Sequence, residues 1–320
     1  MYIQKKSIRA IFLYVLLTVR VIYPAGDNCT EFTTVRKSGS LTPHPNQQTN
    51  QQPDKGYFAC GIPFNRLGNG PRTAVVFQGL VFENKPQADM MVGMYRFLDT
   101  LYSVYVAARK PGLPQGYTLE NMADDYADMI RDEFGGPVDI IGVSTGGSIA
   151  LHFAADHPDL IRRLVIQSSA YTLSEESKAL QLKVADLAKD RHWIRSYAAI
   201  LGYMAPHNCI CRIFSSPLVW LGALVAGILE APENPDDLVI TVEAEDKLNF
   251  KERLSEITVP TLIVAGEADP FYPVELFRET AEGIPECKLI LYPKMGHPAK
   301  GKQFERDVVT FFTEIRSPSD

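Results

Sequence analysis

Cysteine, tryptophan and long hydrophobic runs are all scarce in this chain of 320 residues, which has five Cys and two Trp. The cysteines are too few and too scattered for a disulfide scaffold, and their spacing fits no zinc site: Cys29, Cys60, Cys209, Cys211 and Cys287. No apolar run reaches the roughly 20 residues that span a bilayer. The run at 217–229 has thirteen residues without a charge and predicts a buried helix. These absences exclude a disulfide-rich domain and a multi-span membrane protein.

Basic residues are in excess only near the N-terminus. Residues 1–60 have a net charge of +4, whereas the other 260 residues have a net charge of −10. An acidic body lacks the basic surface that neutralises phosphates, so we expect no nucleic-acid partner. The share of hydrophobic residues, 46%, is that of an ordinary globular protein. The length allows two domains or one large α/β domain with an insertion.

The first 56 residues are expected to lie outside the folded body. Basic residues at positions 5, 6 and 9 precede an apolar run at 10–19, as in a secretory signal, but Arg20 and Tyr23 interrupt that pattern. Residues 1–25 are therefore either a signal peptide or an extension outside the fold, and both secretion and a cytoplasmic location stay open. Residues 26–56 are expected to be a polar linker, rich in proline near its end. In an exported chain Cys29 can pair with Cys60.

From residue 57 onward, short apolar runs alternate with longer amphipathic segments. The expected strands are 73–77, 103–108, 138–143, 164–167, 261–265 and 288–292, and the first helices are 90–101, 119–134 and 146–155. Strands that alternate with helices form a mostly parallel sheet that is covered by helices on both faces. The sequence therefore predicts an α/β fold.

The alternation of strand and helix patterns is interrupted between residues 171 and 257, where every predicted element is a helix. An all-helical stretch inside a chain of alternating strands and helices predicts an inserted helical cap. The core is then formed by residues 57–170 together with residues 258–320. We find no internal repeats.

The most informative motif is Gly142-Val143-Ser144-Thr145-Gly146, which lies where an expected strand meets an expected helix. This is the G-x-S-x-G pattern of a nucleophile elbow, in which small neighbours let the strand and the helix approach closely. A plain turn also fits five such residues, but the flanking strand and helix favour a nucleophilic Ser144.

A serine nucleophile needs a base that takes its proton and an acid that orients the base. Asp269 and His297 each follow a later expected strand, 125 and then 28 residues further along the chain. The order Ser, Asp, His is the one that accompanies this elbow, and loops after parallel strands meet at one sheet edge. Glu267 competes with Asp269 for the role of the acid, and we prefer Asp269, which stands deeper in the turn.

None of the other histidines of the body is expected to serve as the catalytic base. His152 and His157 follow the elbow on its helix, where packing or a helix end explains them. His192 and His207 fall in the expected cap, where they can touch substrate but are not expected to meet Ser144.

An oxyanion needs donors, and backbone N–H groups provide them without specifying a side chain. One expected donor is the N–H of Thr145, directly after the nucleophile. The other is the N–H of Leu80, in the turn Gln78-Gly79-Leu80 that follows the first strand of the body. A simple glycine turn is the alternative explanation for this second stretch.

Taken in order, the stretches FQGL, GVSTGG, PTLIVAGEADPFYP and YPKMGHP make the chain resemble the α/β-hydrolase superfamily over about residues 57–318. The resemblance implies an α/β-hydrolase fold with a helical cap, and it matches Ser144, Asp269 and His297 with the catalytic triad. It also matches Leu80 and Thr145 with the oxyanion hole. Two departures are Gln78 before Gly79, where the family commonly has His, and the stretch 109–112 (RKPG), where members often have Asp, Arg and Gly.

The resulting hypothesis is a serine hydrolase that cleaves a carboxylic ester, including a lactone or an aryl ester, without metal or organic cofactor. Aromatic residues near the expected site suggest a hydrophobic small-molecule substrate: Phe82, Trp220, Phe271 and Tyr272. The fold also hosts C–C bond hydrolases, amidases and cofactor-free haloperoxidases, and it carries some binding proteins, so these stay open. The natural substrate and the oligomeric state are not defined by the sequence.

Overall fold

The computed structural model describes residues 53–205 and 209–314, within a compact unit that begins at Pro53. Its strands are β1 (Asp54–Tyr57), β2 (Pro63–Leu67), β3 (Arg72–Phe77), β4 (Tyr102–Ala107), β5 (Val138–Val143), β6 (Ile161–Gln167), β7 (Thr261–Gly266) and β8 (Cys287–Tyr292). Its α-helices are α2 (Asp89–Val92), α3 (Leu119–Phe134), α4 (Thr145–Asp156), α5 (Glu175–Lys189), α6 (Trp193–Met204), α7 (Cys209–Leu229), α8 (Asp236–Asp246), α9 (Val274–Gly283) and α10 (Lys302–Thr313). Three 3-10 helices are η1 (Gly93–Leu98), η2 (Pro158–Leu160) and η3 (Lys251–Glu256).

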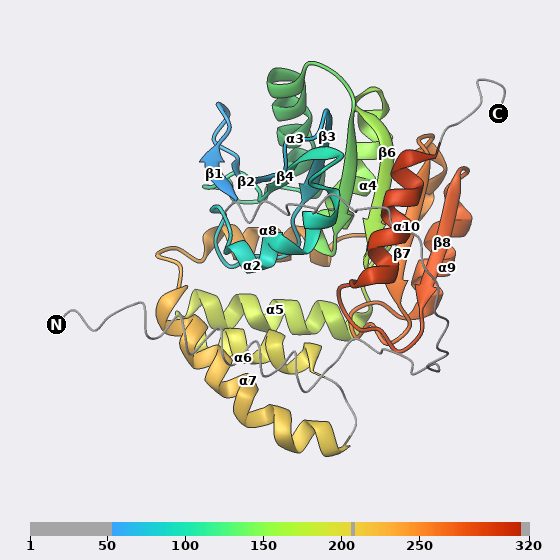
Figure 1. Ribbon diagram of the computed structural model, residues 1–320. Coiled ribbons are helices and arrows are strands. Elements are labelled where there is room, and N and C mark those ends of the chain that lie inside the picture. The colour runs from blue at the N-terminus through green and yellow to red at the C-terminus, as the bar shows by residue number, and fades with distance from the viewer. Residues whose placement is uncertain (1–52, 206–208, 315–320) are drawn as a thin grey trace, which may run out of the picture. The chain divides into compact units, whose positions relative to one another are not determined.

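The strands form one sheet in the order β1-β2-β4-β3-β5-β6-β7-β8 (Figure 1). Strand β2 pairs antiparallel with β1 and with β4, and all the other pairs are parallel. This confirms the α/β fold with a mostly parallel sheet and a helical insert. Because the strands from β3 to β8 run in one direction, the loops that follow them emerge at the same edge of the sheet.

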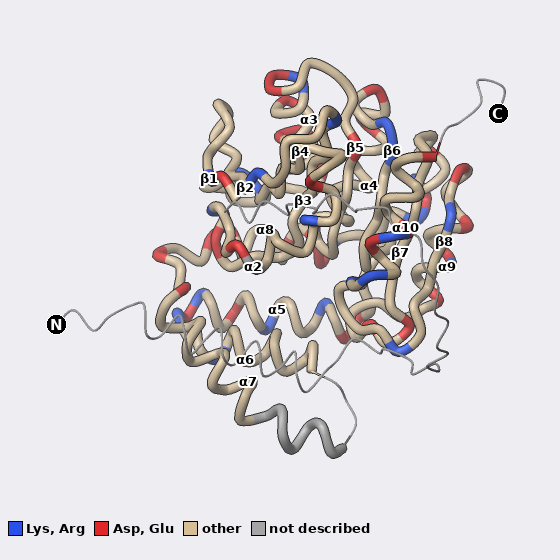
Figure 2. The backbone as a smooth tube through the Cα atoms, in the orientation of Figure 1, with Lys and Arg blue, Asp and Glu red and all other residues tan. Residues whose placement is uncertain are grey.

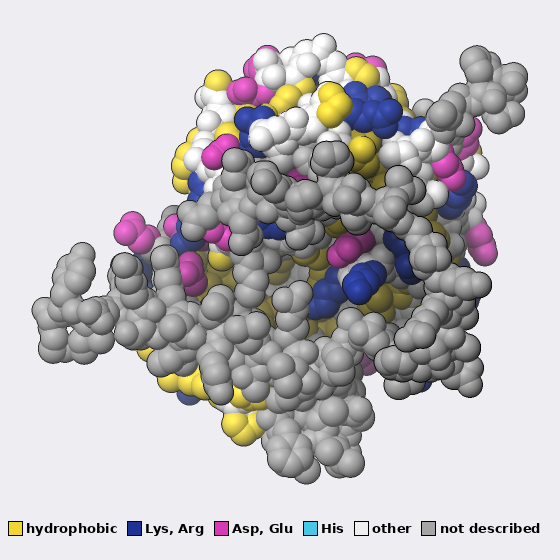
Figure 3. All heavy atoms as spheres, viewed as in Figure 1, with side chains coloured by type: hydrophobic (Ala, Val, Ile, Leu, Met, Phe, Trp, Pro, Cys, Tyr) yellow, Lys and Arg dark blue, Asp and Glu magenta, His cyan; other side chains and the backbone are white. Residues whose placement is uncertain are grey.

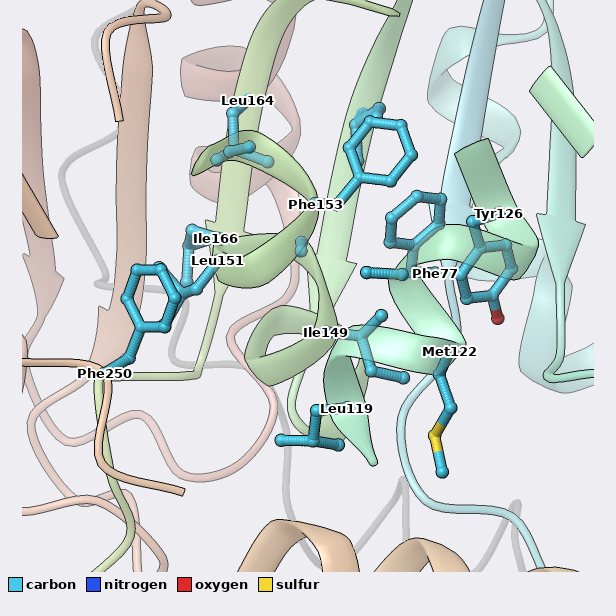
Figure 4. Close-up of a cluster of buried hydrophobic side chains, with 14 of the residues drawn as sticks. Phe77, Leu119, Met122, Tyr126, Ile149, Leu151, Phe153, Leu164, Ile166 and Phe250 are labelled. Atoms are coloured by element: carbon cyan, nitrogen blue, oxygen red, sulfur yellow. The ribbon is translucent and has the colours of Figure 1, made fainter. Parts of the chain in front are cut away.

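Helices cover both faces of the sheet, so successive strand residues are buried on opposite sides. Ile140 packs in a cluster with α3, α4 and α9, whereas its neighbour Ile141 packs with η1 and α10. In the first cluster, shown in Figure 4, the Phe77 ring stacks on Tyr126 with centroids 4.0 Å apart and meets Phe153 edge-on. This double burial explains why β5 is an unbroken apolar run apart from one Asp.

The sequence pattern did not predict two short strands, β1 and β2, because their residues are not uniformly apolar. Strand β2 alternates buried and half-buried positions, and one of the buried ones is Asn65. Asn65 is satisfied by two hydrogen bonds with the backbone of Gln87, which the sequence pattern does not reveal. Strand β1 begins at Asp54, so the sheet starts inside the stretch that was expected to be linker.

The expected helix over 90–101 is wrong. The α-helix ends at Val92 and a 3-10 helix follows from Gly93 to Leu98. Glycine has the weakest helix propensity after proline, so a break at Gly93 has a simple local cause. By contrast, the expected bounds of α3 agree with the structure, because a Thr118 capping box begins the helix and a left-handed Gly135 ends it.

The helical insert consists of α5, α6 and α7, which lie side by side in Figure 1, and of α8, which packs against α5. Helix α8 contributes to two hydrophobic clusters. Ile240 packs in the core cluster that also contains residues of α3 and α4, whereas Leu238 and Val242 pack with residues of the insert helices. The insert is therefore joined to the core through α8 rather than through its ends alone.

The expectation that residues 217–229 form a buried helix is wrong for one side of α7. This stretch carries no charged residue, as Figure 2 shows, yet Trp220 is 53% exposed and Ile228 is 63% exposed. Only the opposite side, with Ala223 and Ala226, is buried, because α7 packs on α6 and has no second layer of described residues over it. Within residues 53–205 and 209–314, no helix combines the length and the apolarity needed to cross a membrane.

The face in Figure 3 carries basic and acidic side chains next to one another, with hydrophobic side chains between them, rather than a field of one sign. Among the described residues, Cys60 and Cys287 are both half-buried, and neither forms a disulfide with another described residue. Cys29 lies outside the described residues, as do residues 1–25, so the pairing of Cys29 with Cys60 and the signal peptide stay predictions.

Candidate active site

Ser144 occupies the sharp turn between β5 and α4. Its backbone has φ 52° and ψ −125°, a strained conformation for a residue with a side chain. The turn is possible because both flanking glycines lack a Cβ. A Cβ on Gly146 would lie 1.9 Å from the carbonyl oxygen of Phe77, and one on Gly142 would lie 2.7 Å from the Cβ of Ala150. The sequence motif therefore folds into the strand–turn–helix geometry of a nucleophile elbow.

His297 and Asp269 reach this serine from the loops that follow β8 and β7. The Nε2 atom of His297 lies 3.0 Å from Ser144 Oγ, and its Nδ1 atom lies 2.8 Å from Asp269 Oδ2. The side chains of His297 and Asp269 are 7% and 0% exposed. A serine, an imidazole and a buried carboxylate are thus joined in one hydrogen-bonded chain, although 125 residues separate the serine from the acid.

Backbone N–H groups hold Asp269 in place. Its Oδ1 accepts hydrogen bonds from the N–H of Phe271 at 2.9 Å and of Tyr272 at 3.3 Å, which leaves Oδ2 for the histidine. Glu267, the competing acid, has an exposed side chain at the surface. The geometry therefore pairs Asp269, and not Glu267, with His297.

The loop that carries His297 is fastened to its neighbours on both sides. The N–H of Ala268 donates to the carbonyl of Met295 at 2.9 Å, which joins this loop to the one that carries Asp269. After His297, the N–H of Ala299 donates to Ser168 Oγ at 2.9 Å, and the Gln167 amide donates to the carbonyl of Ala299 at 2.6 Å. The imidazole is thus positioned by the ends of β6 and β7 as well as by its own strand.

Comparisons with known proteins agree with this geometry. A family model described as the alpha/beta hydrolase fold matches residues 106–202, which contain Ser144. A 2-hydroxy-6-oxononadienedioate/2-hydroxy-6-oxononatrienedioate hydrolase of Pseudomonas sp is 24% identical over 267 residues, which cover 79% of this chain and 90% of the relative. The chain therefore has the α/β-hydrolase fold, and its sequence is similar to that of α/β hydrolases.

Two further similar proteins are named for different activities. The pimeloyl-(acyl-carrier protein) methyl ester esterase of Neisseria meningitidis serogroup B is 26% identical over 173 residues, which cover 53% of this chain and 66% of the relative. The solved structure of the enol-lactonase from Burkholderia xenovorans LB400 has a TM-score of 0.65 at 17% identity and covers 82% of this chain and 100% of its own. At such identities the likeness of structures shows the fold alone.

The two expected oxyanion donors belong to segments that adjoin Ser144. A Cβ on Gly79 would lie 3.3 Å from Ser144 Cβ and 3.9 Å from its Oγ, so the loop that carries Leu80 lies against the nucleophile. Thr145 is fully buried in the first turn of α4, where the first N–H groups of a helix have no partner in the helix itself. Both positions suit the stabilisation of an anion.

The four aromatic residues expected to contact substrate have different surroundings. Phe271 is buried with its ring centroid 4.7 Å from that of His297, and Tyr272 is buried with a centroid distance of 6.1 Å. Phe82 is half-buried and stacks on Tyr197 of the insert, with centroids 3.8 Å apart. Trp220 projects from the exposed side of α7, and its packing gives no support to a substrate role.

Three other histidines of the described chain have surroundings of their own. His152 is buried on α4 and packs edge-on against Phe250, and burial lowers its pKa from the ordinary value of 6.5. His157 bonds Asp124 of α3 at 2.8 Å. His192 precedes α6 with an exposed side chain. His207 lies outside the described residues.

Two buried charged residues near the nucleophile were not predicted as site residues. Arg109, at the end of β4, is 1% exposed, and Glu245, in the last turn of α8, is 0% exposed. Burial lowers the pKa of Arg109 and raises the pKa of Glu245, because a charge is disfavoured away from water. The departure of residues 109–112 from the family pattern was the only sequence signal for Arg109, and Glu245 had none.

Proposed function

We propose that this α/β hydrolase cleaves a carboxylic ester through a covalent acyl-enzyme intermediate. The observation that carries the proposal is the hydrogen-bonded chain from Ser144 Oγ through His297 to the buried Asp269, with distances of 3.0 and 2.8 Å. A strained, glycine-flanked serine in line with an imidazole is the arrangement that nucleophilic acyl transfer requires.

In the proposed mechanism, Ser144 Oγ attacks the ester carbonyl while His297 Nε2 takes the hydroxyl proton. Asp269 accepts the Nδ1–H bond, which keeps the free lone pair of the imidazole on Nε2 and stabilises the imidazolium. The N–H groups of Leu80 and Thr145 stabilise the oxyanion. The imidazolium then returns the proton to the departing alcohol, and a water activated by the same His297 releases the acid.

The choice of an ester rests on the relatives rather than on the triad. The names of two similar proteins describe a methyl ester esterase and an enol-lactonase, whose substrates have an oxygen leaving group. The relative that covers 79% of this chain is named as a hydrolase of 2-hydroxy-6-oxononadienedioate, which makes that compound the competing substrate.

The deciding experiment measures turnover of p-nitrophenyl esters of short and medium chain length by the purified protein. Ser144→Ala is expected to abolish turnover, whereas Ser255→Ala, an exposed serine on η3, is the matched control and is expected to retain it. A fluorophosphonate is expected to label Ser144, as read by peptide mass spectrometry. Labelling without ester turnover would contradict the ester proposal. The activity to test would then be hydrolysis of 2-hydroxy-6-oxononadienedioate, hydrolysis of an amide, or peroxide-dependent halogenation. No labelling of the folded protein would overturn the proposal and favour a binding protein.

We also propose that the substrate is a hydrophobic small molecule. Phe271 offers apolar surface beside His297, and Phe82 offers apolar surface where the loop that carries Leu80 meets the insert. Phe271→Ala keeps the backbone N–H that bonds Asp269, so it is expected to weaken the preference for longer acyl chains without removing turnover. Trp220→Ala is the comparison, and an unchanged chain-length preference in that variant ends its proposed substrate role.

A further inference from the structure

Two buried charges lie directly behind the expected oxyanion donors. Arg109 approaches from the end of β4, and Glu245 approaches from α8 of the insert. Both side chains are almost completely shielded from solvent, at 1% and 0% exposure. Burying a charge is costly, and apolar residues of similar volume often give equal or greater stability. The contacts of these two residues indicate a purpose other than stability.

Arg109 binds the loop that carries Leu80. Its Nη1 donates to the carbonyl oxygens of both Gln78 and Gly79, at 3.1 Å each. The carbonyl of Gly79 and the N–H of Leu80 belong to one planar trans peptide unit, so they point in opposite directions. A guanidinium that holds the Gly79 carbonyl therefore turns the Leu80 N–H to the side away from Arg109. Gly79, the residue before this N–H, lies against Ser144.

Glu245 binds the helix turn that carries Thr145. One carboxylate oxygen accepts a hydrogen bond from Thr145 Oγ1 and the other accepts one from Ser148 Oγ, at 2.8 Å each. Both hydroxyls belong to the first turn of α4, directly after the nucleophile. The carboxylate thus fastens the start of this helix to α8 and fixes the peptide whose N–H is the second expected donor.

The two charges also support each other. The guanidinium of Arg109 favours the ionised form of Glu245, which burial alone would disfavour, and the hydroxyl donors act in the same direction on the pKa. In the described chain, the Nε and Nη2 atoms of Arg109 have no hydrogen-bond partner, so its polar contacts are those to Gln78 and Gly79. Among the described residues, the guanidinium of Arg109 therefore donates its hydrogen bonds only to the loop that carries Leu80.

We propose that Arg109 and Glu245 are positioning residues that hold the Leu80 and Thr145 N–H groups in place on either side of Ser144. This inference rests on the proposed acyl-transfer function and deepens it. Because oxyanion donors act on the transition state more than on bound substrate, loss of either residue is expected to lower kcat with little change in KM. Removing one donor outright costs about 100- to 1,000-fold, so a misplaced donor is expected to cost about 10- to 100-fold.

The test compares Arg109→Met, Arg109→Lys and Glu245→Gln with the control Glu243→Gln. Glu243 also lies on α8, two residues before Glu245, and its carboxylate accepts hydrogen bonds from Lys189 and Gln115 rather than from the segments that carry Leu80 and Thr145. Arg109→Met and Glu245→Gln are expected to lower kcat about 10- to 100-fold with KM within threefold. Arg109→Lys keeps a cationic donor and is expected to recover part of kcat, whereas Glu243→Gln is expected to stay within threefold.

A second measurement separates this inference from the choice of substrate. The rate at which a fluorophosphonate labels Ser144 depends on the nucleophile and on the oxyanion donors, whatever bond the enzyme cleaves in nature. The same variants are expected to slow labelling by a factor similar to their loss of kcat. Labelled protein without ester turnover would contradict the ester proposal and leave this comparison intact.

Three results would overturn the inference. These are kcat and labelling within threefold of wild type in folded Arg109→Met and Glu245→Gln, a rise in KM that accounts for the whole loss, and an equal loss in Glu243→Gln. If Arg109→Met does not fold, Arg109→Lys and Glu245→Gln decide the question by the same criteria.

Discussion

Asp269→Asn tests the proposed triad most directly, because the structure dictates how the new amide must turn. In the wild type, Oδ1 accepts two backbone N–H groups and Oδ2 accepts the His297 Nδ1–H bond. An Asn that placed its NH2 against Phe271 and Tyr272 would set donors against donors, at a cost of about 1–3 kcal/mol for each unsatisfied buried group. The amide oxygen is therefore expected to stay on the backbone side.

The NH2 group of the Asn then faces His297 Nδ1, which must become an acceptor. The ring proton moves to Nε2, and an Nε2–H cannot take the proton of Ser144. The wrong tautomer is expected to lower kcat by about 1,000- to 10,000-fold, equivalent to about 4–5.5 kcal/mol of transition-state stabilisation.

The assay is the turnover of a p-nitrophenyl ester, together with thermal unfolding of each variant. Asp269→Asn is expected to melt close to wild type, because the amide is isosteric and keeps both backbone bonds. Glu267→Gln is the matched control, and its exposed side chain predicts less than a twofold change in kcat. A folded Asp269→Asn that keeps kcat within tenfold of wild type would refute the role of Asp269, and a large loss in Glu267→Gln would transfer it.

Two predictions concern stability. Gly146→Ala places a Cβ 1.9 Å from the Phe77 carbonyl and is expected to lower the free energy of unfolding by about 3 kcal/mol. The control Gly136→Ala meets no atom within 4 Å, and equal melting temperatures for the two variants would contradict the tight-elbow argument. Burial lowers the pKa of His152 from 6.5, so below about pH 6.5 the unfolded chain binds a proton that the folded chain does not. The free energy of unfolding, measured with denaturant, is expected to fall between pH 6.5 and pH 5 and to do so less steeply in His152→Gln; identical slopes would show that His152 does not contribute.

The local features of the fold were readable from residue patterns. Strand β5 and helix α3 have the expected bounds, because an unbroken apolar run and a pair of helix caps are signals within a few residues of one another. The elbow at Ser144 is of the same kind, since the two glycines that allow it are its neighbours. Strand β2 was missed because its buried Asn65 is satisfied by a distant backbone.

The meeting of distant segments could not be read from the pattern. Glu267 and Asp269 are both acidic residues in one turn, and only the folded loops bring Asp269 to His297 and leave Glu267 in solvent. The exposure of α7 depends on which layers pack beside it, and a run of apolar residues does not contain that information. The Arg109 and Glu245 contacts join residues far apart in sequence, so a buried charge there looks in the sequence like any surface charge. Side-chain burial and hydrogen-bond partners are properties of the packed chain, whereas strand, turn and helix signals are properties of neighbours along it.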